Sequence, residues 1–164
     1  MIIKRKQSIK TFSGIVSGAT YAENNQAKRT ERIVINNRFN SLIIDESRDM
    51  DIGQYDSGPA VQANNYDTAT NIDIKTQNIT NQGDGLIVNN EGNGFTHIKT
   101  GNINATGTAI AVTTGELAQD ISIDTQNIQS SESSNVVTVQ NRGKIAPSVS
   151  KVATYILVTK AASV

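Results

Sequence analysis

Hydrophobic and polar residues alternate along three similar stretches in the middle of the chain. The stretches begin at Ile72, Thr96 and Ile121, and the first reads Ile72-Asp73-Ile74. A period of two is typical of a β-strand with one buried face, whereas a helix needs apolar residues three and four positions apart. Thr, Ile and Val dominate the stretches, as a half-buried pleated surface favours. The pattern therefore predicts three equivalent β-strands.

The three stretches repeat at a nearly constant spacing, which the threonines Thr76, Thr100 and Thr125 mark. A second apolar alternation follows each of the first two copies at the same distance, beginning at Leu86 and at Ile110. A self-similar period of about 20–50 residues indicates a repeat architecture. One repeat is therefore predicted to be a coil of strand, turn, strand and turn.

A single coil of this kind cannot cover its own apolar face, whereas roughly three or more stacked copies can. We therefore predict an all-β parallel β-solenoid, a β-helix, whose successive coils lie about 4.8 Å apart. Residues at equivalent positions then form ladders along the solenoid. The predicted inward ladders are Ile74, Ile98 and Ile123; Ile79, Ile103 and Ile128; Val88, Val112 and Val139; and Thr76, Thr100 and Thr125.

Asparagines at the strand ends form a further predicted row, made of Asn78, Asn102 and Asn127. Stacked asparagines can hydrogen-bond from coil to coil. Asparagine also tolerates the left-handed backbone that many turns require. We expect a mixture of the two effects, and neither implies a catalytic role.

The number of coils follows from a polar residue that recurs once per coil, at the turn after the second apolar alternation. These residues recur at similar but not identical intervals, at Asn37, Asn65, Asn90, Thr114 and Asn141. About five coils are therefore predicted, with less regular early coils. Residues 33–164 are assigned to the β-helix, with a charged turn at 46–51, a polar insertion at 130–134 and a last apolar strand at 155–159. An uncapped apolar edge invites pairing, so we expect self-association through the solenoid ends.

Residues 1–32 do not follow this pattern. A positive head that includes Lys4-Arg5-Lys6 precedes a weakly apolar stretch at 11–19, and Ala22 before Glu23 offers a cleavage site. These are the parts of a secretory signal, although Ser and Gly dilute the apolar stretch. The segment 1–32 is therefore interpreted either as signal-like or as a disordered or capping terminus.

Composition narrows the class of protein. The 164 residues suffice for one domain, and 37% of them are hydrophobic but only 4% aromatic, which suits a thin solenoid. The net charge is zero and no basic stripe with interleaved aromatic residues occurs, so a nucleic-acid partner is not expected. No apolar run approaches the roughly 18 residues of a membrane-spanning helix. Cysteine is absent, which excludes disulfides and cysteine-ligated metal.

The coils resemble the passenger domains of Gram-negative autotransporters. The resemblance rests on the phrase Ile-x-Ile-x-Thr-x-Asn-Ile, a turn rich in Asn and Gly, and then an apolar-x-Val-x-Asn/Thr strand, and it covers residues 33–143. It implies a right-handed parallel β-helix at the cell surface or secreted, commonly an adhesin or another virulence factor. The membrane β-barrel that ends such proteins has no counterpart here, so the resemblance implies a passenger segment.

We expect no enzymatic activity, and the pattern predicts no catalytic, cofactor-binding or metal-binding residues. The predicted outward rows are Asp73, His97 and Ser122, and Lys75, Lys99 and Asp124. Neither row gathers the carboxylates that polysaccharide lyases and hydrolases with this fold require. His97 is the single histidine, and a lone histidine without an acid positioned to act with it is a poor candidate for a catalyst. The acidic residues at 45–56 lack a calcium-binding pattern and are interpreted as a charged loop.

The favoured function is therefore a non-enzymatic, surface-exposed or secreted β-helix that contacts a host-surface protein or glycan. The alternative is a carbohydrate-active β-helix or its inactive remnant, in which Asp73 and His97 are the residues to test. Export from a Gram-negative cell is expected under the first interpretation.

Overall fold

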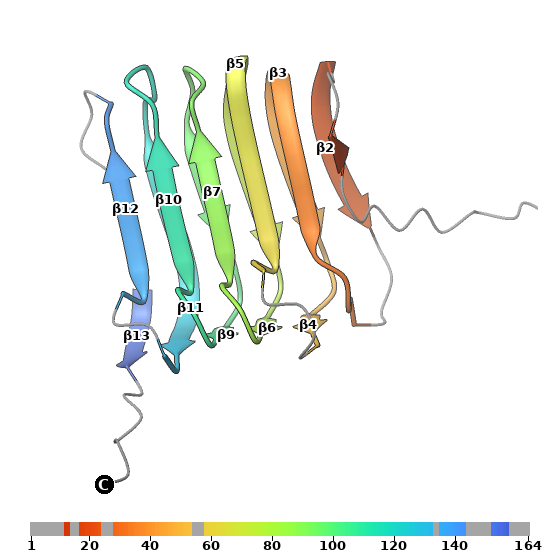
Figure 1. The fold of residues 1–164 in the computed structure, drawn as a ribbon, viewed down its shortest axis with the longest axis vertical. Coiled ribbons are helices and arrows are strands. Elements are labelled where there is room, and N and C mark those ends of the chain that lie inside the picture. Colours follow the sequence, from red (N-terminus) through yellow and green to blue (C-terminus); the bar gives the residue numbers. More distant parts are fainter. Residues whose placement is uncertain are drawn as a thin grey trace, which may run out of the picture.

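The computed structural model describes residues 12–13, 17–23, 28–53, 58–132, 135–143 and 152–157. For 12–13, 17–23 and 152–157 only the course of the strands is described. The described residues form thirteen strands (Figure 1). These are β1 (Phe12–Ser13), β2 (Ser17–Glu23), β3 (Ile33–Glu46), β4 (Met50–Ile52), β5 (Val61–Thr76), β6 (Ile79–Asn81), β7 (Leu86–Asn90), β8 (Thr96–Lys99), β9 (Ile103–Ala105), β10 (Ile110–Thr114), β11 (Ile121–Ser130), β12 (Val137–Asn141) and β13 (Val152–Leu157).

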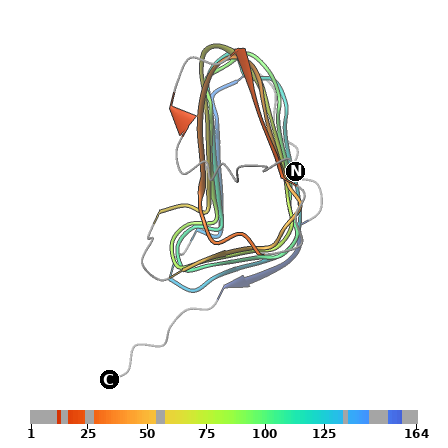
Figure 2. The ribbon, with the colours of Figure 1, turned by 90° about the vertical axis from the view of Figure 1, so that its right-hand side faces the viewer.

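The strands wind into a parallel β-solenoid, as predicted. All the strand pairs are parallel, and each strand lies beside its equivalents in the preceding and following coils. One coil consists of β7, β8 and β9 in succession, whereas in other coils β3, β5 and β11 each continue round a corner and fill two of the three positions. Seen from the N-terminal side, the stacked coils share one elongated outline (Figure 2).

The solenoid has about four turns rather than the five predicted. Complete turns are formed by β3–β4, β5–β6, β7–β9 and β10–β11. The fifth turn mark, Asn141, ends β12, and residues 144–151 lie outside the described residues. The right-handed winding implied by the resemblance remains a prediction.

The predicted inward ladders are confirmed by the strand register. Ile98 pairs with Ile74 in the coil before it and with Ile123 in the coil after it. The ladders through Ile103 and Val112 have the predicted partners as well. The side chains of Ile98 and Ile103 are almost wholly buried. This confirms that the period-two alternation places the branched apolar residues in one continuous core.

The exposed asparagine row hydrogen-bonds from coil to coil, as predicted. The Asn78 side-chain oxygen accepts the Asn102 N–H at 2.9 Å, and the Asn102 oxygen accepts the Asn127 amide at 3.1 Å. Among the described non-glycine residues, a positive φ occurs at Asn40 and Asp67 and not in this row. Of the two effects expected together in this row, tolerance of a left-handed turn therefore does not apply to these three asparagines.

A second asparagine ladder lies inside the solenoid at the turn marks. Asn37, Asn65 and Asn90 are fully buried. The Asn37 amide donates to the Asn65 oxygen at 3.0 Å, and the Asn65 amide donates to the Asn90 oxygen at 3.4 Å. Thr114 and Asn141 continue the row with a hydrogen bond of 2.8 Å. The marks recur in the sequence because each coil must satisfy the polar groups of its neighbour at the same buried corner.

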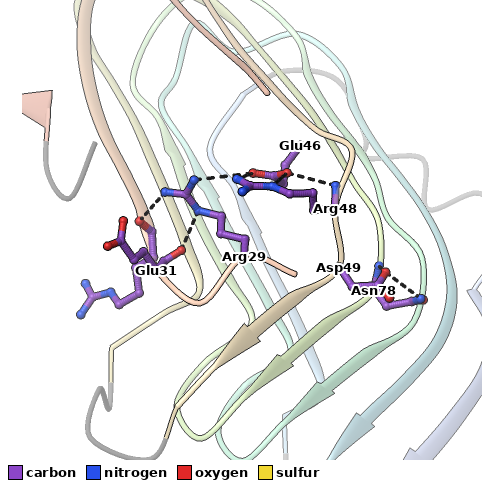
Figure 3. A network of polar contacts seen from close by, with 7 residues as sticks. Arg29, Glu31, Glu46, Arg48, Asp49 and Asn78 are labelled. Atoms are coloured by element: carbon purple, nitrogen blue, oxygen red, sulfur yellow. Dashed lines mark hydrogen bonds and ion pairs between the residues drawn. The ribbon is translucent and has the colours of Figure 1, made fainter. Parts of the chain in front are cut away.

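The predicted charged turn at 46–51 is confirmed only for residues 47–49, which connect β3 to β4 with a bend at Arg48, and its inward charged groups were not predicted. β3 runs to Glu46, and β4 begins at Met50. Glu46 and Arg48 point into the solenoid, where Arg29 approaches the same carboxylate (Figure 3). Inward direction follows from the pleat, because Leu42 and Ile44 on the same strand are also buried.

Residues before the predicted start of the solenoid also contact it. β1 and β2 pair in parallel with β3, and Arg29 forms an isolated bridge with Met50. The positive head around Lys4, and Asp56 of the acidic stretch, lie outside the described residues. The signal-like role of the N-terminus remains a prediction. The described residues form no helix of the length and apolarity that a bilayer span requires.

Candidate functional site

The solenoid presents two long outer walls of different chemistry. The outward residues of β3, β5, β7, β10 and β12 before the corner form what we term the neutral face. Those of β5 after the corner, β8 and β11, together with the residues directly before these last two strands, form what we term the charged face. The charged face comprises Asp73, Lys75, Phe95, His97, Lys99, Asp120, Ser122 and Asp124.

The predicted outward rows are confirmed on the charged face. Asp73 pairs with His97, and His97 pairs with Ser122. Lys99 pairs with Lys75 on one side and with Asp124 on the other. The buried residues between them, such as Ile98, fix these side chains to a rigid sheet. A rigid sheet holds a set of side chains more accurately than a mobile loop does.

His97 has a second acidic neighbour, which the alternation within the repeats did not predict. Its Nε2 lies 3.7 Å from Oδ2 of Asp120, an ion pair when the imidazole is protonated. Asp120 directly precedes β11, and the N–H of Thr96 donates to its carbonyl, so Asp120 lies in the row of Phe95. The sequence does contain a signal for this position: the outward alternation, continued two residues before Ser122, reaches Asp120.

Phe95 stacks on His97. The two ring centroids are 4.1 Å apart and the ring planes differ by 19°. Side chains two positions apart on a strand point to the same side, which brings the rings together. Asn71 anchors this position, because its side-chain oxygen accepts the Phe95 N–H at 3.1 Å. An aromatic ring, an imidazole and a carboxylate therefore form one half-buried cluster, which we term the His97 cluster: Phe95, His97 and Asp120.

Lysines and carboxylates occupy the rest of the charged face. Lys99 Nζ lies 3.7 Å from Asp124 Oδ2, and both side chains are well exposed. An exposed pair of this kind contributes about 0–1 kcal/mol to stability. The pair therefore adds little to the fold and leaves both groups close to solvent, where a partner can reach them.

The chemistry of the charged face suits recognition. Lys donates hydrogen bonds, Asp accepts them, and an aromatic ring provides an apolar surface beside them. Among the residues that the structure describes, no group of three or more His, Asp or Glu side chains lies close enough to hold a metal ion. The paired carboxylate and imidazole of the His97 cluster are the described groups nearest to an acid–base arrangement.

Comparisons of the chain with protein-family models, with curated proteins and with solved structures gave no match. The resemblance to autotransporter passengers thus rests on the residues of the coils themselves.

Proposed function

We propose that this chain is a non-enzymatic β-solenoid, exported to the cell surface or secreted, which adheres to a host-surface protein or glycan through its charged face. The observation that carries the proposal is the His97 cluster, together with the lysine and aspartate rows beside it. These side chains stand on consecutive coils at the regular spacing of strands. A flat array of donors, acceptors and an aromatic ring matches an extended polar partner.

The interior of the solenoid supports this role. Inward polar residues such as Asn65 and Thr100 form hydrogen bonds to neighbouring coils. Because these contacts lie inside the solenoid, the outward side chains can differ from coil to coil without lowering the stability of the fold. Binding residues on a rigid scaffold lose little conformational entropy on contact.

Binding is tested by passing the full chain over immobilised host matrix proteins and cell-surface glycans. We expect His97→Ala and Asp120→Asn each to weaken the captured interaction about tenfold, which corresponds to about 1.4 kcal/mol. Thr113→Ala, on the neutral face, is the matched control and is expected to bind as the unaltered chain does. Equal binding by all the variants, or no binding to any surface, would contradict adhesion through the charged face.

Export is tested separately by fractionating a Gram-negative cell that expresses the chain and sequencing the mature N-terminus. We expect periplasmic or extracellular protein that starts near Glu23. An intact Met1 in the cytosol would contradict export and would reduce the autotransporter resemblance to a shared fold.

A second candidate is a carbohydrate-active solenoid or its inactive remnant. It is favoured by the position of His97 between Asp73, its strand partner, and Asp120, its ion-pair partner. Release of reducing sugar from pectins or host glycans, abolished by Asp73→Asn or His97→Ala, would establish this activity in place of the non-enzymatic role.

A further inference from the structure

The neutral face carries no charged side chain in its two central rows. Both rows cross five strands in the order β3, β5, β7, β10 and β12. The first row is Val34, Gln62, Ile87, Ala111 and Thr138. The second row is Asn36, Asn64, Asn89, Thr113 and Gln140. The whole chain has 15 basic and 15 acidic residues, so two wholly uncharged outward rows set this wall apart from the charged face.

Two side-chain amides of the second row donate hydrogen bonds within the row itself. The Asn64 amide donates to the Asn36 oxygen at 2.8 Å, and the Asn89 amide donates to the Asn64 oxygen at 2.8 Å. Covering a polar group costs free energy mainly when its hydrogen bonds to water are not replaced. Since Asn36, Asn64 and Asn89 are bonded along the sheet, another surface can cover this part of the row at a reduced desolvation cost.

The neutral face is also regular along the solenoid axis. The strand register from β3 to β12 is unbroken across these rows, and the shifts between β3 and β5 begin only after Asn37. Ile87 and Val34 add apolar contact area beside the amides, and both are half-buried. Two sheets with the same strand spacing can interdigitate side chains over their whole length, as packed sheets do.

We propose that the neutral face binds a second copy of this chain, with the two neutral faces packed against each other. A two-fold dimer brings the same surface patch of both subunits together. On the charged face each Lys and Asp would have to meet a group of opposite charge across the two-fold axis to avoid repulsion, whereas the neutral face sets no such condition. Depletion of charge is also the compositional mark of an interface core. The dimer leaves the charged face of each copy outward, so this inference goes beyond the proposed adhesion and does not depend on it.

A second copy fits this face better than a glycan does. The two rows contain no aromatic side chain to stack on a sugar ring. The Asn64 and Asn89 amides donate along the row, which reduces the number of donors available to sugar hydroxyl groups. A second copy supplies the same spacing, the same neutrality and the same self-satisfied amides.

The mass of the purified full chain in solution tests the dimer, by light scattering and sedimentation over a range of micromolar concentrations. We expect a concentration-dependent dimer. Ile87→Lys places a charge at the central strand of the neutral face and is expected to raise the dimer dissociation constant at least tenfold. Thr113→Lys is a second variant of the same kind at a neighbouring strand. Both positions face outward, and circular dichroism verifies that each variant is folded.

Ser122→Lys is the matched control, because it adds the same charge to a half-exposed strand position on the charged face. We expect it to dimerise as the unaltered chain does. A monomer at every concentration would overturn the proposal, and so would a dimer that is equally stable in the folded Ile87→Lys and Thr113→Lys variants. Equal weakening by Ser122→Lys would place the interface on the charged face, and capture of a neutral glycan by a monomer would assign the neutral face to that ligand instead.

Discussion

Replacing Glu46 with glutamine is expected to lower the free energy of unfolding by about 3–5 kcal/mol, the range observed when one partner of a buried ion pair is removed. The Glu46 side chain is fully buried, and Arg29 and Arg48 beside it are only 5% and 6% exposed. Glutamine has the shape of glutamate but no charge. The substitution therefore leaves two guanidinium groups in the interior without their anion.

The geometry of the contacts to Glu46 explains why the loss of stability is large. Arg48 donates from Nε to Oε1 of Glu46 at 2.8 Å and from Nη2 to Oε2 at 2.9 Å, a bidentate contact. The Arg48 backbone N–H adds a bond to Oε1 at 3.0 Å, and Arg29 approaches Oε2 at 3.6 Å (Figure 3). Charge-assisted bidentate bonds are among the strongest in proteins, and glutamine cannot accept all of them.

Denaturant unfolding measures the effect, with Asp45→Asn as the matched control. Asp45 is the neighbour of Glu46 on β3, faces outward and is exposed. Its replacement removes the same charge and is expected to change stability by no more than about 0.5 kcal/mol. Because coils contact only their neighbours, hydrogen exchange should accelerate first in the coil that contains β3 and β4. Losses of similar size in the two variants would show that net charge, and not the buried contact, determines stability.

The apolar ladders could be predicted from the sequence, and this buried ion network could not. Ile74, Ile98 and Ile123 share one residue type and a nearly constant spacing, so that the repeat itself places them in register. Glu46 occupies the inward position that Thr76 occupies one coil later. Two register shifts relative to β5 lie between the start of β3 and this part of it, so that the simple period fails between them.

The charge pattern of 45–51 added to the error, because a dense run of charged residues, here four acidic residues around Arg48, usually indicates a solvated turn. The Arg48 side chain is instead accommodated inside because its acceptor, on Glu46, is close to it in the sequence. Arg29 arrives from a segment that no repeat connects to β3. Neither relation leaves a periodic signal in the sequence.

The candidate site was partly predictable for the same reason. The rows of Asp73, His97 and Ser122 follow directly from the alternation, and the register confirms them. The ion pair of His97 with Asp120 was missed because Asp120 precedes the apolar residues that define the repeat. Contacts between adjacent rows depend on side-chain direction, which a list of equivalent positions does not contain.

The two asparagine ladders, one buried and one exposed, allow the contribution of burial to stability to be separated from that of residue type. Asn65→Ala is expected to cost roughly 2–4 kcal/mol, because two to three hydrogen bonds are lost inside the core at about 1 kcal/mol or more each when partners remain unsatisfied. Asn65 donates to the carbonyl of Asn71 at 2.9 Å and accepts from Asn37 at 3.0 Å. Water cannot replace these bonds, since Asn65 and Asn37 are fully buried.

Asn78→Ala is the matched control in the exposed ladder. Its side chain also bonds to both neighbouring coils, donating to Asp49 at 3.0 Å and accepting from the Asn102 N–H at 2.9 Å. Water can satisfy these groups after the substitution, so that we expect a loss below about 1 kcal/mol. Denaturant midpoints of the two variants, with an unchanged slope, give the comparison. Equal losses would mean that the exposed ladder sets the coil spacing as strongly as the buried one, and that the hydrogen bonds between coils stabilise the solenoid whether or not they are buried.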